Sequence, residues 1–413
     1  MSAQATIVIV GGGLAAVRAL HKLRELGSSD RVILISEERY PPYDRPPLSK
    51  DLLLQGEPAH SPLHVASFYS DPHLDLRLGN CVKSLNSEEH SILLESEEKV
   101  RYDKLLIATG ARPRVLPIFS ALGERAVTLR ALDDALALRA RLSKRPGHRL
   151  AVIGAGVLGL EIAASAKTMG CEVTVLERLP GVMARVQCEP VSAFLLSLHQ
   201  RNGVRFIFSD HVIAVESHAD GSALLRTDGG REITVDTVVV AIGVQPNDEF
   251  ARNAGLSVKD GICVDEECRT SEPDIYAAGD VAAQWHPKLQ AYIRSEHWAS
   301  AQEQGRIAAT SMLASKPRMI REIPWLWTDQ FESNIQMAGR LQPEEWIARG
   351  DNTAVTFTLF GIDSDGTLTG AVTVNRGRDM RPARTMIAAH AAPSREALAS
   401  SATDLGRLSK QFA

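Results

Sequence analysis

Two glycine-rich patterns contain the residues of this sequence whose spacing best suits nucleotide binding. Gly11, Gly13 and Ala16 form G-x-G-x-x-A between an apolar run and a helical pattern. The segment from Gly154 to Gly159 repeats the arrangement with a third glycine, as G-x-G-x-x-G. Glycines permit a tight turn and close approach of the backbone to a pyrophosphate, and a helix N-terminus adds unpaired N–H groups. A single match is a weak signal, because glycine-rich turns occur in many folds.

A carboxylate follows each pattern at the distance expected for ribose recognition. Glu37 lies 24 residues beyond Gly13, and Glu177 lies 21 residues beyond Gly156, where a carboxylate can accept a hydrogen bond from a ribose hydroxyl. Two patterns with two carboxylates predict two dinucleotide sites. Glu177 would also repel a 2′-phosphate, which favours NADH over NADPH, although the adjacent Arg178 could soften this preference.

An internal repeat indicates the elements that position these residues. Ile7 to Leu20 resembles Leu150 to Ala163, and Tyr102 to Pro113 matches Val235 to Pro246. The offsets are 143 residues at the first glycine, 140 at the acidic residue and 133 at the later glycine. Short apolar runs that alternate with helical patterns are typical of strands buried on both faces of a parallel sheet. We therefore predict a doubly wound α/β fold with two related nucleotide-binding domains.

The later part of the chain indicates that the second domain is inserted into the first. A third glycine-terminated strand pattern, Ile275 to Asp280, has no dinucleotide pattern of its own and is read as the return of the chain to the first domain. From about residue 321, aromatic and β-prone segments at 325–330, 353–360 and 368–375 indicate an α+β domain. The expected domains are 1–113 with 245–320, then 114–244, then 321–413.

This order of motifs predicts which nucleotide each domain binds. The first domain is split by the second and closes with Gly279 and Asp280, whose carboxylate could hydrogen-bond the ribityl or pyrophosphate region of FAD. The first site is therefore expected to hold FAD. The site of the inserted domain is expected to hold NADH, bound and released in each cycle.

Composition narrows the class of protein. Of 413 residues, 44% are hydrophobic and 23% are charged, and 46 Lys and Arg stand against 50 Asp and Glu. This near-balance gives no global field for nucleic acid, and no apolar window reaches the length of a membrane helix. The five cysteines have no CxxC pattern; Cys263 and Cys268 could form a redox couple or half a metal site, but packing as free thiols is favoured. We expect a cytoplasmic protein without a signal peptide, metal site, nucleic-acid partner or membrane association.

Several segments resemble one enzyme family. Tyr43 to Lys50 (YDRPPLSK), Thr109-Gly110, Gly154 to Glu161, Ala278 to Asp280 and Pro324 to Gln330 (PWLWTDQ) are similar to the FAD-dependent NADH:ferredoxin reductases of Rieske-type dioxygenases and haem monooxygenases. The likeness covers nearly the whole chain and implies a glutathione reductase-like fold.

The resemblance also implies a reaction. Where disulfide reductases carry a redox cysteine, this chain has PPLSK, so a reduced flavin would pass its electrons elsewhere. The family transfers a hydride from NADH to flavin and then single electrons to a [2Fe–2S] ferredoxin that feeds an oxygenase, as in aromatic hydrocarbon catabolism. The alternatives are an NADH oxidase and a redox-sensing flavoprotein of the apoptosis-inducing-factor type.

Lys50 and Glu161 are the catalytic candidates. In the family that this chain resembles, the lysine lies near the flavin and pairs with a glutamate, which maps onto Glu161. A cation there would stabilise an anionic reduced flavin, and its partner would limit the cost of burying it. The alternative is a surface lysine and a first-turn glutamate favoured by the helix dipole.

The expected cofactor sites combine the motifs with the resemblance. The resemblance places Val82 at the adenine, Arg130 at the flavin end and Trp298 at the pyrimidine edge of the flavin; a core valine, a solvated arginine and a packed indole are the alternatives. The FAD residues are Gly11, Gly13, Leu14, Ala15, Ala16, Glu37, Arg45, Lys50, Val82, Ala108, Thr109, Gly110, Arg130, Gly279, Asp280 and Trp298. The NAD residues are Gly154, Gly156, Val157, Leu158, Gly159, Glu177, Arg185 and Gly243.

A basic stretch is the candidate docking surface for an acidic ferredoxin. Arg376, Arg378, Arg381 and Arg384 against Asp379 give a net charge of +3 in nine residues. The resemblance places Trp327 near the flavin on the ferredoxin-facing side, whereas a core tryptophan and a solvated basic face are the plain alternatives. Both a monomer and a dimer stay open.

Overall fold

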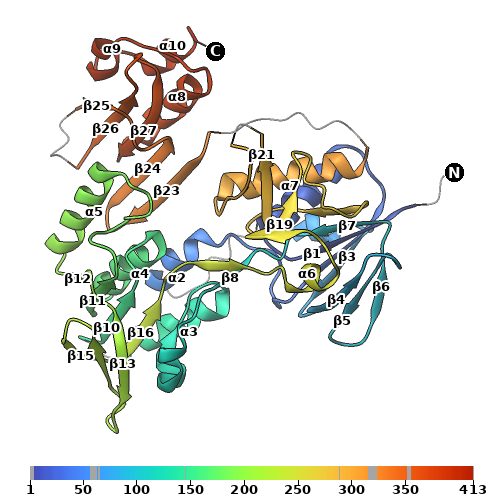
Figure 1. The fold of residues 1–413 in the computed structure, drawn as a ribbon, viewed down its shortest axis with the longest axis horizontal. Helices are drawn as coiled ribbons and strands as arrows, with labels where there is room; N and C mark the ends of the chain where they lie inside the picture. The colour runs from blue at the N-terminus through green and yellow to red at the C-terminus, as the bar shows by residue number, and fades with distance from the viewer. Residues whose placement is uncertain are drawn as a thin grey trace. The chain divides into compact units, whose positions relative to one another are not determined.

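The computed structural model describes residues 4–55, 63, 66–144, 146–287, 289–314, 323–350 and 355–412 (Figure 1). The chain forms two compact units. Unit 1 comprises residues 1–44, 59–112 and 244–322, and unit 2 comprises residues 45–58, 113–243 and 323–413. Each unit contains one of the two glycine-rich patterns.

Unit 1 is built on a five-stranded parallel sheet. Its order is β20 (Ile275–Ala277), β7 (Lys104–Ile107), β1 (Thr6–Val10), β2 (Arg31–Ser36) and β3 (Leu74–Leu78). Alternate residues of β1 enter different cores, because successive strand side chains point to opposite faces. Ile7 and Ile9 pack with α1 (Leu14–Glu25) and α7 (Trp298–Met312), whereas Val8 and Val10 pack toward the smaller sheets.

Smaller elements cover the second face of this sheet and join the segments of unit 1. One sheet is antiparallel and consists of β4 (Val82–Asn86), β5 (Ser91–Leu94) and β6 (Lys99–Arg101). A second, mixed sheet consists of β18 (Val258–Lys259), β19 (Gly261–Val264), β21 (Ala282–His286) and β22 (Ala291–Arg294), in which only the β19–β21 pair is parallel. A third sheet pairs β8 (Ala111–Pro113) with β17 (Val244–Pro246). The short helices are the 3-10 helix Ala66–Ser70 and α6 (Glu249–Asn253).

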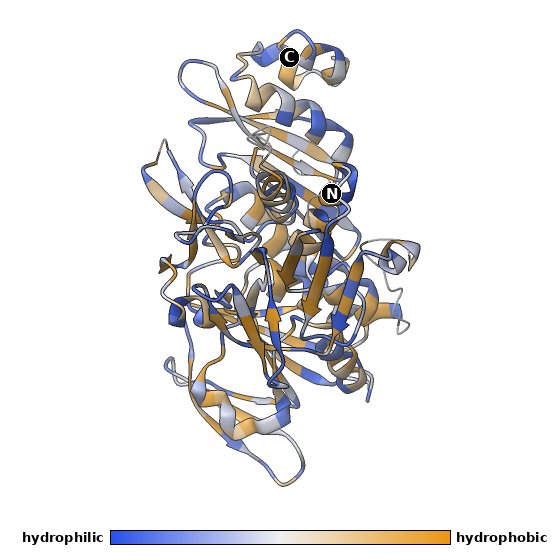
Figure 2. Cartoon of the chain, turned by 90° about the vertical axis from the view of Figure 1, so that its right-hand side faces the viewer, coloured by the Kyte–Doolittle hydropathy of each residue, from blue (hydrophilic) through white to orange (hydrophobic). Residues whose placement is uncertain are grey.

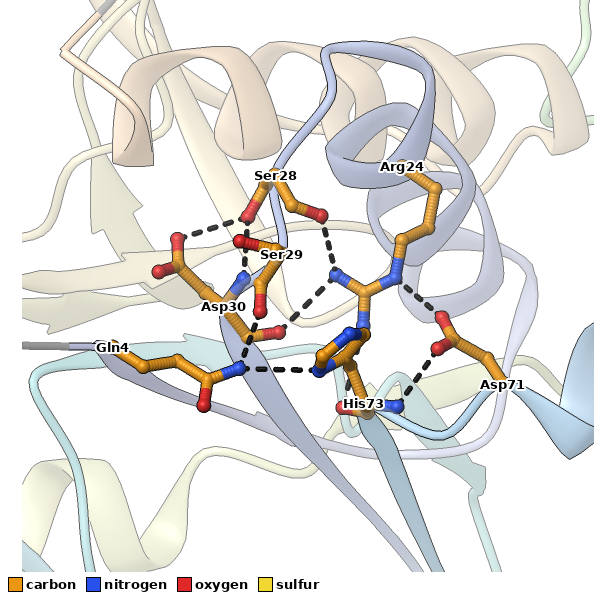
Figure 3. A network of polar contacts seen from close by, with 7 residues as sticks. All are labelled: Gln4, Arg24, Ser28, Ser29, Asp30, Asp71 and His73. Atoms are coloured by element: carbon orange, nitrogen blue, oxygen red, sulfur yellow. Dashed lines mark hydrogen bonds and ion pairs between the residues drawn. The ribbon is translucent and has the colours of Figure 1, made fainter. Parts of the chain in front are cut away.

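A polar network holds the far end of α1 against the starts of β2 and β3 (Figure 3). Arg24 Nε lies 2.5 Å from Asp71 Oδ2, and its other nitrogens donate to the carbonyls of Ser28, Asp30 and His73 at 3.0 to 3.3 Å. One guanidinium thus satisfies the carbonyls of two loops. The network fixes the C-terminal end of the helix whose other end follows the first glycine turn.

Unit 2 repeats the parallel sheet. The order is β12 (Arg205–Phe208), β11 (Glu172–Glu177), β10 (Arg149–Ile153), β16 (Thr237–Val240) and β9 (Ala126–Val127). The central strand β10 lies between β11 and β16, just as β1 lies between β2 and β7. The repeat in the sequence therefore corresponds to two sheets of the same local topology, as predicted for a doubly wound fold. Figure 2 shows hydrophobic colour along many of the strands.

Helices and a hairpin sheet complete this part of unit 2. The helices are α3 (Leu132–Leu142), α4 (Val157–Thr168) and α5 (Glu189–Arg201), with the 3-10 helix Pro117–Arg125. The antiparallel strands are β13 (Val212–Ser217), β14 (Ala223–Thr227) and β15 (Glu232–Val235). The segment before the first gap adds the 3-10 helix Pro46–Ser49 and α2 (Asp51–Gln55).

The C-terminal part of unit 2 is a five-stranded antiparallel sheet with helices. The order is β23 (Trp325–Gln330), β24 (Ser333–Gly339), β27 (Leu368–Val374), β26 (Phe357–Ile362) and β25 (Glu345–Arg349), followed in the chain by α8 (Gly377–Ala388), α9 (Arg395–Ala399) and α10 (Leu405–Ser409). The predicted α+β character is confirmed. The sequence prediction missed β24 and β25. Positions 353 and 354 and the expected boundary at 320/321 lie outside the described residues.

Three further observations concern the predictions about a membrane helix, a metal site and the cysteines. No helix in the described part of the chain combines the length and apolar character needed to span a bilayer. The described residues also contain no group of three or more His, Cys, Asp or Glu placed to hold a metal ion. All five cysteines are free, and four of them are buried.

Candidate functional site

The first glycine turn joins β1 to α1 in a conformation that requires glycine. Gly11 has φ of 114°, and a Cβ added there would lie 2.2 Å from the carbonyl oxygen of Ala108. Gly13 is the N-cap of α1, and no heavy atom lies within 4 Å of the place where its Cβ would be. The helix has no side-chain cap and no acid in its first turn. Open space beside unpaired helix N–H groups fits a pyrophosphate.

The return of the chain in unit 1 brings Gly279 to this turn. Gly279 has φ of 81°, and a Cβ there would lie 3.1 Å from the Cβ of Ala15. Its N–H donates to Gln304 Oε1 at 2.8 Å, which ties it to α7. A Cβ on Gly305 of α7 would lie 2.3 Å from the carbonyl oxygen of Ala15, so the two helices approach closely. The structure therefore brings Ala15 and Gly279 together at the start of α1.

Other predicted FAD residues of unit 1 follow strand ends or begin elements. Glu37 directly follows β2 and is exposed, and Ala108 follows β7. Thr109 Oγ1 donates to the carbonyl of Asn247 at 2.9 Å, and Asn247 Nδ2 donates back to the carbonyl of Thr109 at 3.0 Å. Trp298 is the first residue of α7, and its indole N–H donates a hydrogen bond to Asp44 Oδ1 at 3.1 Å. The remaining members are Leu14 and Ala16 in the first turn of α1, Val82 at the start of β4, Gly110, and Asp280 after Gly279.

Three predicted FAD residues belong to unit 2. Arg45, Lys50 and Arg130 lie in its segments 45–58 and 113–243. A guanidinium nitrogen of Arg45 donates to the carbonyl of Arg130 at 2.7 Å. The structure thus places Arg45 beside Arg130 within unit 2.

The second glycine turn reproduces the first between β10 and α4. Gly154 has φ of 108°, and a Cβ there would lie 2.4 Å from the carbonyl oxygen of Ala241. A Cβ on Gly159 would lie 2.1 Å from the carbonyl oxygen of Gly154, which explains the third glycine. Gly156 is the N-cap of α4 and, like Gly13, has no heavy atom within 4 Å of its Cβ position. Val157 and Leu158 form the first turn, half-buried.

Glu177 is fixed by the backbone around this turn. One carboxylate oxygen accepts from the N–H of Ala155 at 2.8 Å, and the other accepts from the N–H of Leu179 at 2.8 Å. Each oxygen keeps a second lone pair for a ribose hydroxyl. Gly243 has φ of 102°, and its Cβ position lies 3.4 Å from a guanidinium nitrogen of Arg185. These two predicted NAD residues also lie together.

Lys50 and Glu161 form an ion pair within unit 2. Lys50 Nζ lies 3.2 Å from Glu161 Oε1, and the two side chains are 14% and 7% exposed. Lys50 follows the 3-10 helix Pro46–Ser49, and Glu161 lies one turn into α4. Ser49 Oγ donates to the second oxygen of Glu161 at 2.5 Å. Burial raises the pKa of Glu161, and Lys50 is the strongest opposing influence.

Strand β23 contributes residues that sequence reasoning missed. Thr328 Oγ1 donates to Glu161 Oε1 at 2.6 Å, and Asp329 Oδ2 lies 3.1 Å from Lys50 Nζ. The ring of Trp327 lies 5.9 Å from the same ammonium. Both missed residues stand in PWLWTDQ, next to the predicted Trp327, but nothing in their local pattern indicates which side chain they meet.

A buried chain of hydrogen bonds extends from Glu161 toward α5. Gln330 Nε2 donates to Thr328 Oγ1 at 2.9 Å, and Gln330 Oε1 lies 2.7 Å from His199 Nε2. These side chains are almost completely buried. Because the amide oxygen can only accept, His199 Nε2 carries the hydrogen, and every donor points toward Glu161. Burial also lowers the pKa of His199, which favours its neutral form.

The candidate docking residues lie on β23 and α8. Trp325 stacks on Trp327 with ring centroids 5.0 Å apart, and the guanidinium of Arg384 lies 5.1 Å from the ring of Trp325. Arg376 is directed inward, with Nε 2.8 Å from the buried carboxylate of Asp379. The side chain of Arg378 is 82% exposed, and Arg381 is also exposed.

Comparisons with known proteins agree with this architecture. The pyridine nucleotide-disulphide oxidoreductase family model matches residues 5–305, and the reductase C-terminal model matches residues 325–409. The chain is 40% identical over 383 residues to the 3-phenylpropionate/cinnamic acid dioxygenase ferredoxin–NAD(+) reductase component of Photorhabdus laumondii subsp. laumondii, covering 93% of this chain and 96% of that protein.

Two more similarities extend over nearly the full length or all of it. The anthranilate 1,2-dioxygenase system ferredoxin–NAD(+) reductase component of Burkholderia cepacia is 40% identical over 394 residues, 95% of this chain and 96% of that protein. Among solved structures, the covalent putidaredoxin reductase–putidaredoxin complex matches with a TM-score of 0.91 at 31% identity, covering 100% of this chain and 99% of the matched chain.

Proposed function

Because the chain belongs to the pyridine nucleotide-disulphide oxidoreductase family, we propose that it is an FAD-dependent ferredoxin–NAD(+) reductase that passes electrons from NADH to the ferredoxin of an oxygenase system. The observation that carries this proposal is the Lys50–Glu161 ion pair at 3.2 Å. The segment that would hold a redox disulfide ends instead in Lys50, whose charge is paired with Glu161. All five cysteines are free. The electrons must therefore leave for an acceptor other than a disulfide of this chain.

The residues present fit both nucleotides. In each unit a glycine N-cap leaves open space at the start of a 12-residue helix. Two residues earlier, a glycine with positive φ lies so close to the carbonyl group after an adjacent strand that a side chain would clash. We assign FAD to the turn at Gly11 and Gly13, and NADH to the turn at Gly154 and Gly156. Bound FAD supplies the exchange between a two-electron donor and a one-electron acceptor.

The ion pair would assist this exchange through charge. Lys50 places a positive charge in a largely buried position, where an interaction with developing negative charge is stronger than in water. Glu161 lowers the cost of burying that charge, and hydrogen bonds from Ser49 and Thr328 occupy its oxygens. We propose Lys50 and Glu161 as the catalytic pair on this basis.

The ferredoxin surface is proposed on β23 and α8. The stacked Trp325 and Trp327 connect Arg384 with the ammonium of Lys50 through successive ring contacts. Arg378, Arg381 and Arg384 could meet an acidic [2Fe–2S] ferredoxin. Arg376 is engaged by Asp379, so we assign it to the stability of α8 rather than to docking.

The same proposal extends to domains and compartment. We propose FAD binding by 1–113 with 245–320, NADH binding by 114–244, and ferredoxin docking by 321–413. Free cysteines suit a reducing compartment, and on this basis we propose the cytoplasm.

A ferredoxin-dependent assay tests the function. The holoenzyme is mixed with NADH under air, with cytochrome c as the final acceptor and with or without a Rieske-system [2Fe–2S] ferredoxin. Rapid reduction of cytochrome c is expected only when ferredoxin is present. Fast oxygen uptake without ferredoxin would indicate an NADH oxidase. A reduced flavin that persists with NAD and turns over slowly with ferredoxin would indicate a redox-sensing flavoprotein.

A further inference from the structure

The ammonium of Lys50 contacts two carboxylates. Nζ lies 3.2 Å from Glu161 Oε1 and 3.1 Å from Asp329 Oδ2, so the two ion pairs are of nearly equal length. The carboxylates differ in environment, because the side chain of Glu161 is 7% exposed and that of Asp329 is 45% exposed. With all three groups ionised, the cluster carries a net charge of −1. The cluster therefore has one negative charge more than is needed to neutralise Lys50.

The carboxylate of Asp329 is held by the side-chain amide of Asn334 on the adjacent strand β24. Asn334 Nδ2 donates to Asp329 Oδ1 at 2.6 Å, which leaves Oδ2 directed to Lys50. Asn334 Oδ1 accepts from Gln336 Nε2 at 2.9 Å, and the backbone N–H of Asn334 donates to Asn375 Oδ1 at 2.8 Å. An exposed ion pair gains little when both side chains are free to move. This bracing reduces the freedom that Asp329 would lose on pairing.

The position of β23 explains how one strand reaches both members of the Lys50–Glu161 pair. β23 is the edge strand of the C-terminal sheet. Thr328 is fully buried and contacts Glu161, whereas the adjacent Asp329 is half-exposed and contacts Lys50. Successive side chains of a strand point to opposite faces. Because no described strand lies on the outer side of β23, its side chains on both faces can contact the Lys50–Glu161 pair. The C-terminal sheet thus supplies a second counter-ion to a residue that lies 279 positions earlier.

We propose that Asp329 is a positioning residue that holds the Lys50 ammonium against Glu161 and sets the net charge of the cluster. Its effect on a bound flavin rests on the function proposed above, but the restraint on Lys50 does not. Removing the charge of Asp329 would free the lysine on its exposed side. It would also leave the positive field of Lys50 less compensated, which favours a reduced, more negative flavin.

The test compares Asp329→Asn with a matched control. Glu345 is a half-exposed carboxylate on the opposite edge strand of the same sheet and pairs with Arg395 at 2.8 Å, so Glu345→Gln makes the same charge change away from Lys50. Brief treatment with acetic anhydride, followed by mass spectrometry, measures the reactivity of Lys50. Lys104, one-third exposed and paired with Asp274, is the internal reference.

The restraint predicts a specific change in reactivity. Lys50 in Asp329→Asn should be acetylated about threefold faster, the size expected for loss of a partly exposed ion pair. Lys104 should react at an unchanged rate, and Glu345→Gln should match the wild type. Asp329→Glu should restore much of the protection. If Asp329→Asn does not fold, Asn334→Ala removes the brace and should raise the reactivity of Lys50 in the same direction.

A second readout separates this role from a purely structural one. The midpoint potential of bound FAD should become more positive in Asp329→Asn and stay unchanged in Glu345→Gln. Equal acetylation of Lys50 in the wild type and Asp329→Asn overturns the proposal, as does an unchanged potential. A wild-type protein that binds FAD but reduces no ferredoxin would contradict the proposed function. The acetylation rate of Lys50 and the midpoint potential of FAD would still test the role of Asp329 in that case.

Discussion

The hydroxyl of Thr328 donates to Glu161 Oε1 at 2.6 Å and joins the first strand of the C-terminal sheet to helix α4. Both side chains are buried, and Thr328 also accepts from Gln330 Nε2. Glu161 therefore receives hydrogen bonds from two hydroxyls and an ion pair from Lys50. The C-terminal sheet thus supplies one of the two hydroxyls that donate to this buried carboxylate.

Replacing this hydroxyl should destabilise the fold. Thr328→Val keeps the shape of the side chain but removes a donor to a buried carboxylate and the acceptor of Gln330. A hydrogen bond to a charged group contributes about 2 kcal/mol, so a loss of that size in the free energy of unfolding is expected from denaturant titration. Thr328→Ser restores the hydroxyl and should recover most of the stability. Equal stabilities of the valine and serine variants would contradict the role of this hydrogen bond.

Removal of Lys50 should give a pH-dependent loss of stability. Burial already raises the pKa of Glu161, and Lys50→Met removes the main opposing influence, so the pKa rises further. Because the folded pKa lies above the unfolded value, ionisation of Glu161 destabilises the fold as the pH rises through the folded pKa. Breaking a buried pair costs about 3 kcal/mol. We expect such a loss in the free energy of unfolding at a pH above the folded pKa of Glu161. The loss should become smaller as the pH falls below that pKa, because the buried carboxyl group is then neutral.

The same variant has a kinetic consequence. FAD reduction by NADH should slow at least about tenfold because a charge near the reaction is lost, while the flavin absorbance of the purified protein is retained. Lys104→Met, which breaks the Lys104–Asp274 pair in unit 1, is the control for loss of a lysine. Loss of FAD, a normal rate, or a stability loss that does not depend on pH would count against the assigned role of Lys50.

The parts of the fold that could be predicted from the sequence are those with local signals. The two glycine turns need backbone conformations and close approaches that only glycine allows, as at Gly11 and Gly159. The strands around them are buried on both faces, so they appear as short apolar runs. By contrast, β24 (SNIQMAG) mixes polar and apolar residues and β25 (EWIAR) is short, and neither contains a β-branched run.

The contacts of β23 could not be predicted for a different reason. Thr328 meets a residue 167 positions away, and Asp329 meets one 279 positions away. Resemblance pointed to Lys50, Glu161 and Trp327, but no period or spacing links a polar strand residue to a particular distant side chain. The inward direction of Arg376 likewise depends on Asp379 being buried, which the charge pattern does not reveal.

Alanine at two glycines of the first turn, Gly11 and the N-cap Gly13, should separate folding from cofactor binding. Gly13→Ala adds a methyl group where no protein atom lies within 4 Å, whereas Gly11→Ala would strain a residue with φ of 114° and strike the carbonyl of Ala108. We expect Gly13→Ala to fold but to lose FAD affinity by about tenfold or more, and Gly11→Ala to accumulate poorly. Far-ultraviolet circular dichroism and the ratio of flavin to protein absorbance measure the two effects. Full FAD content in Gly13→Ala would place the cofactor elsewhere.

The carboxylate of Glu177 should set the preference between the two nicotinamide nucleotides. Glu177→Gln removes the charge that would repel a 2′-phosphate but keeps an oxygen that can accept from the N–H of Ala155 or Leu179. The ratio of kcat/KM for NADH to that for NADPH should fall about tenfold. The wild type is expected to prefer NADH, and Glu37→Gln in the other glycine pattern serves as the control. Equal use of both nucleotides by the wild type would refute this role of Glu177.

The exposed arginines of α8 should control the encounter with ferredoxin. Arg378→Glu reverses a charge on a side chain that is 82% exposed, and rim charges act mainly on the association rate. Ferredoxin reduction should fall about fivefold at low salt, and the difference should shrink as ionic strength rises because the charges are screened.

Two controls isolate the docking step. Arg407→Glu makes the same change on an arginine that is 89% exposed in α10, and it should reduce ferredoxin at nearly the wild-type rate. Turnover from NADH to ferricyanide should be unchanged in both variants, because a small acceptor needs no protein docking surface. Equal losses in Arg378→Glu and Arg407→Glu would show that overall charge governs the encounter, and the assignment of docking to α8 would then be wrong.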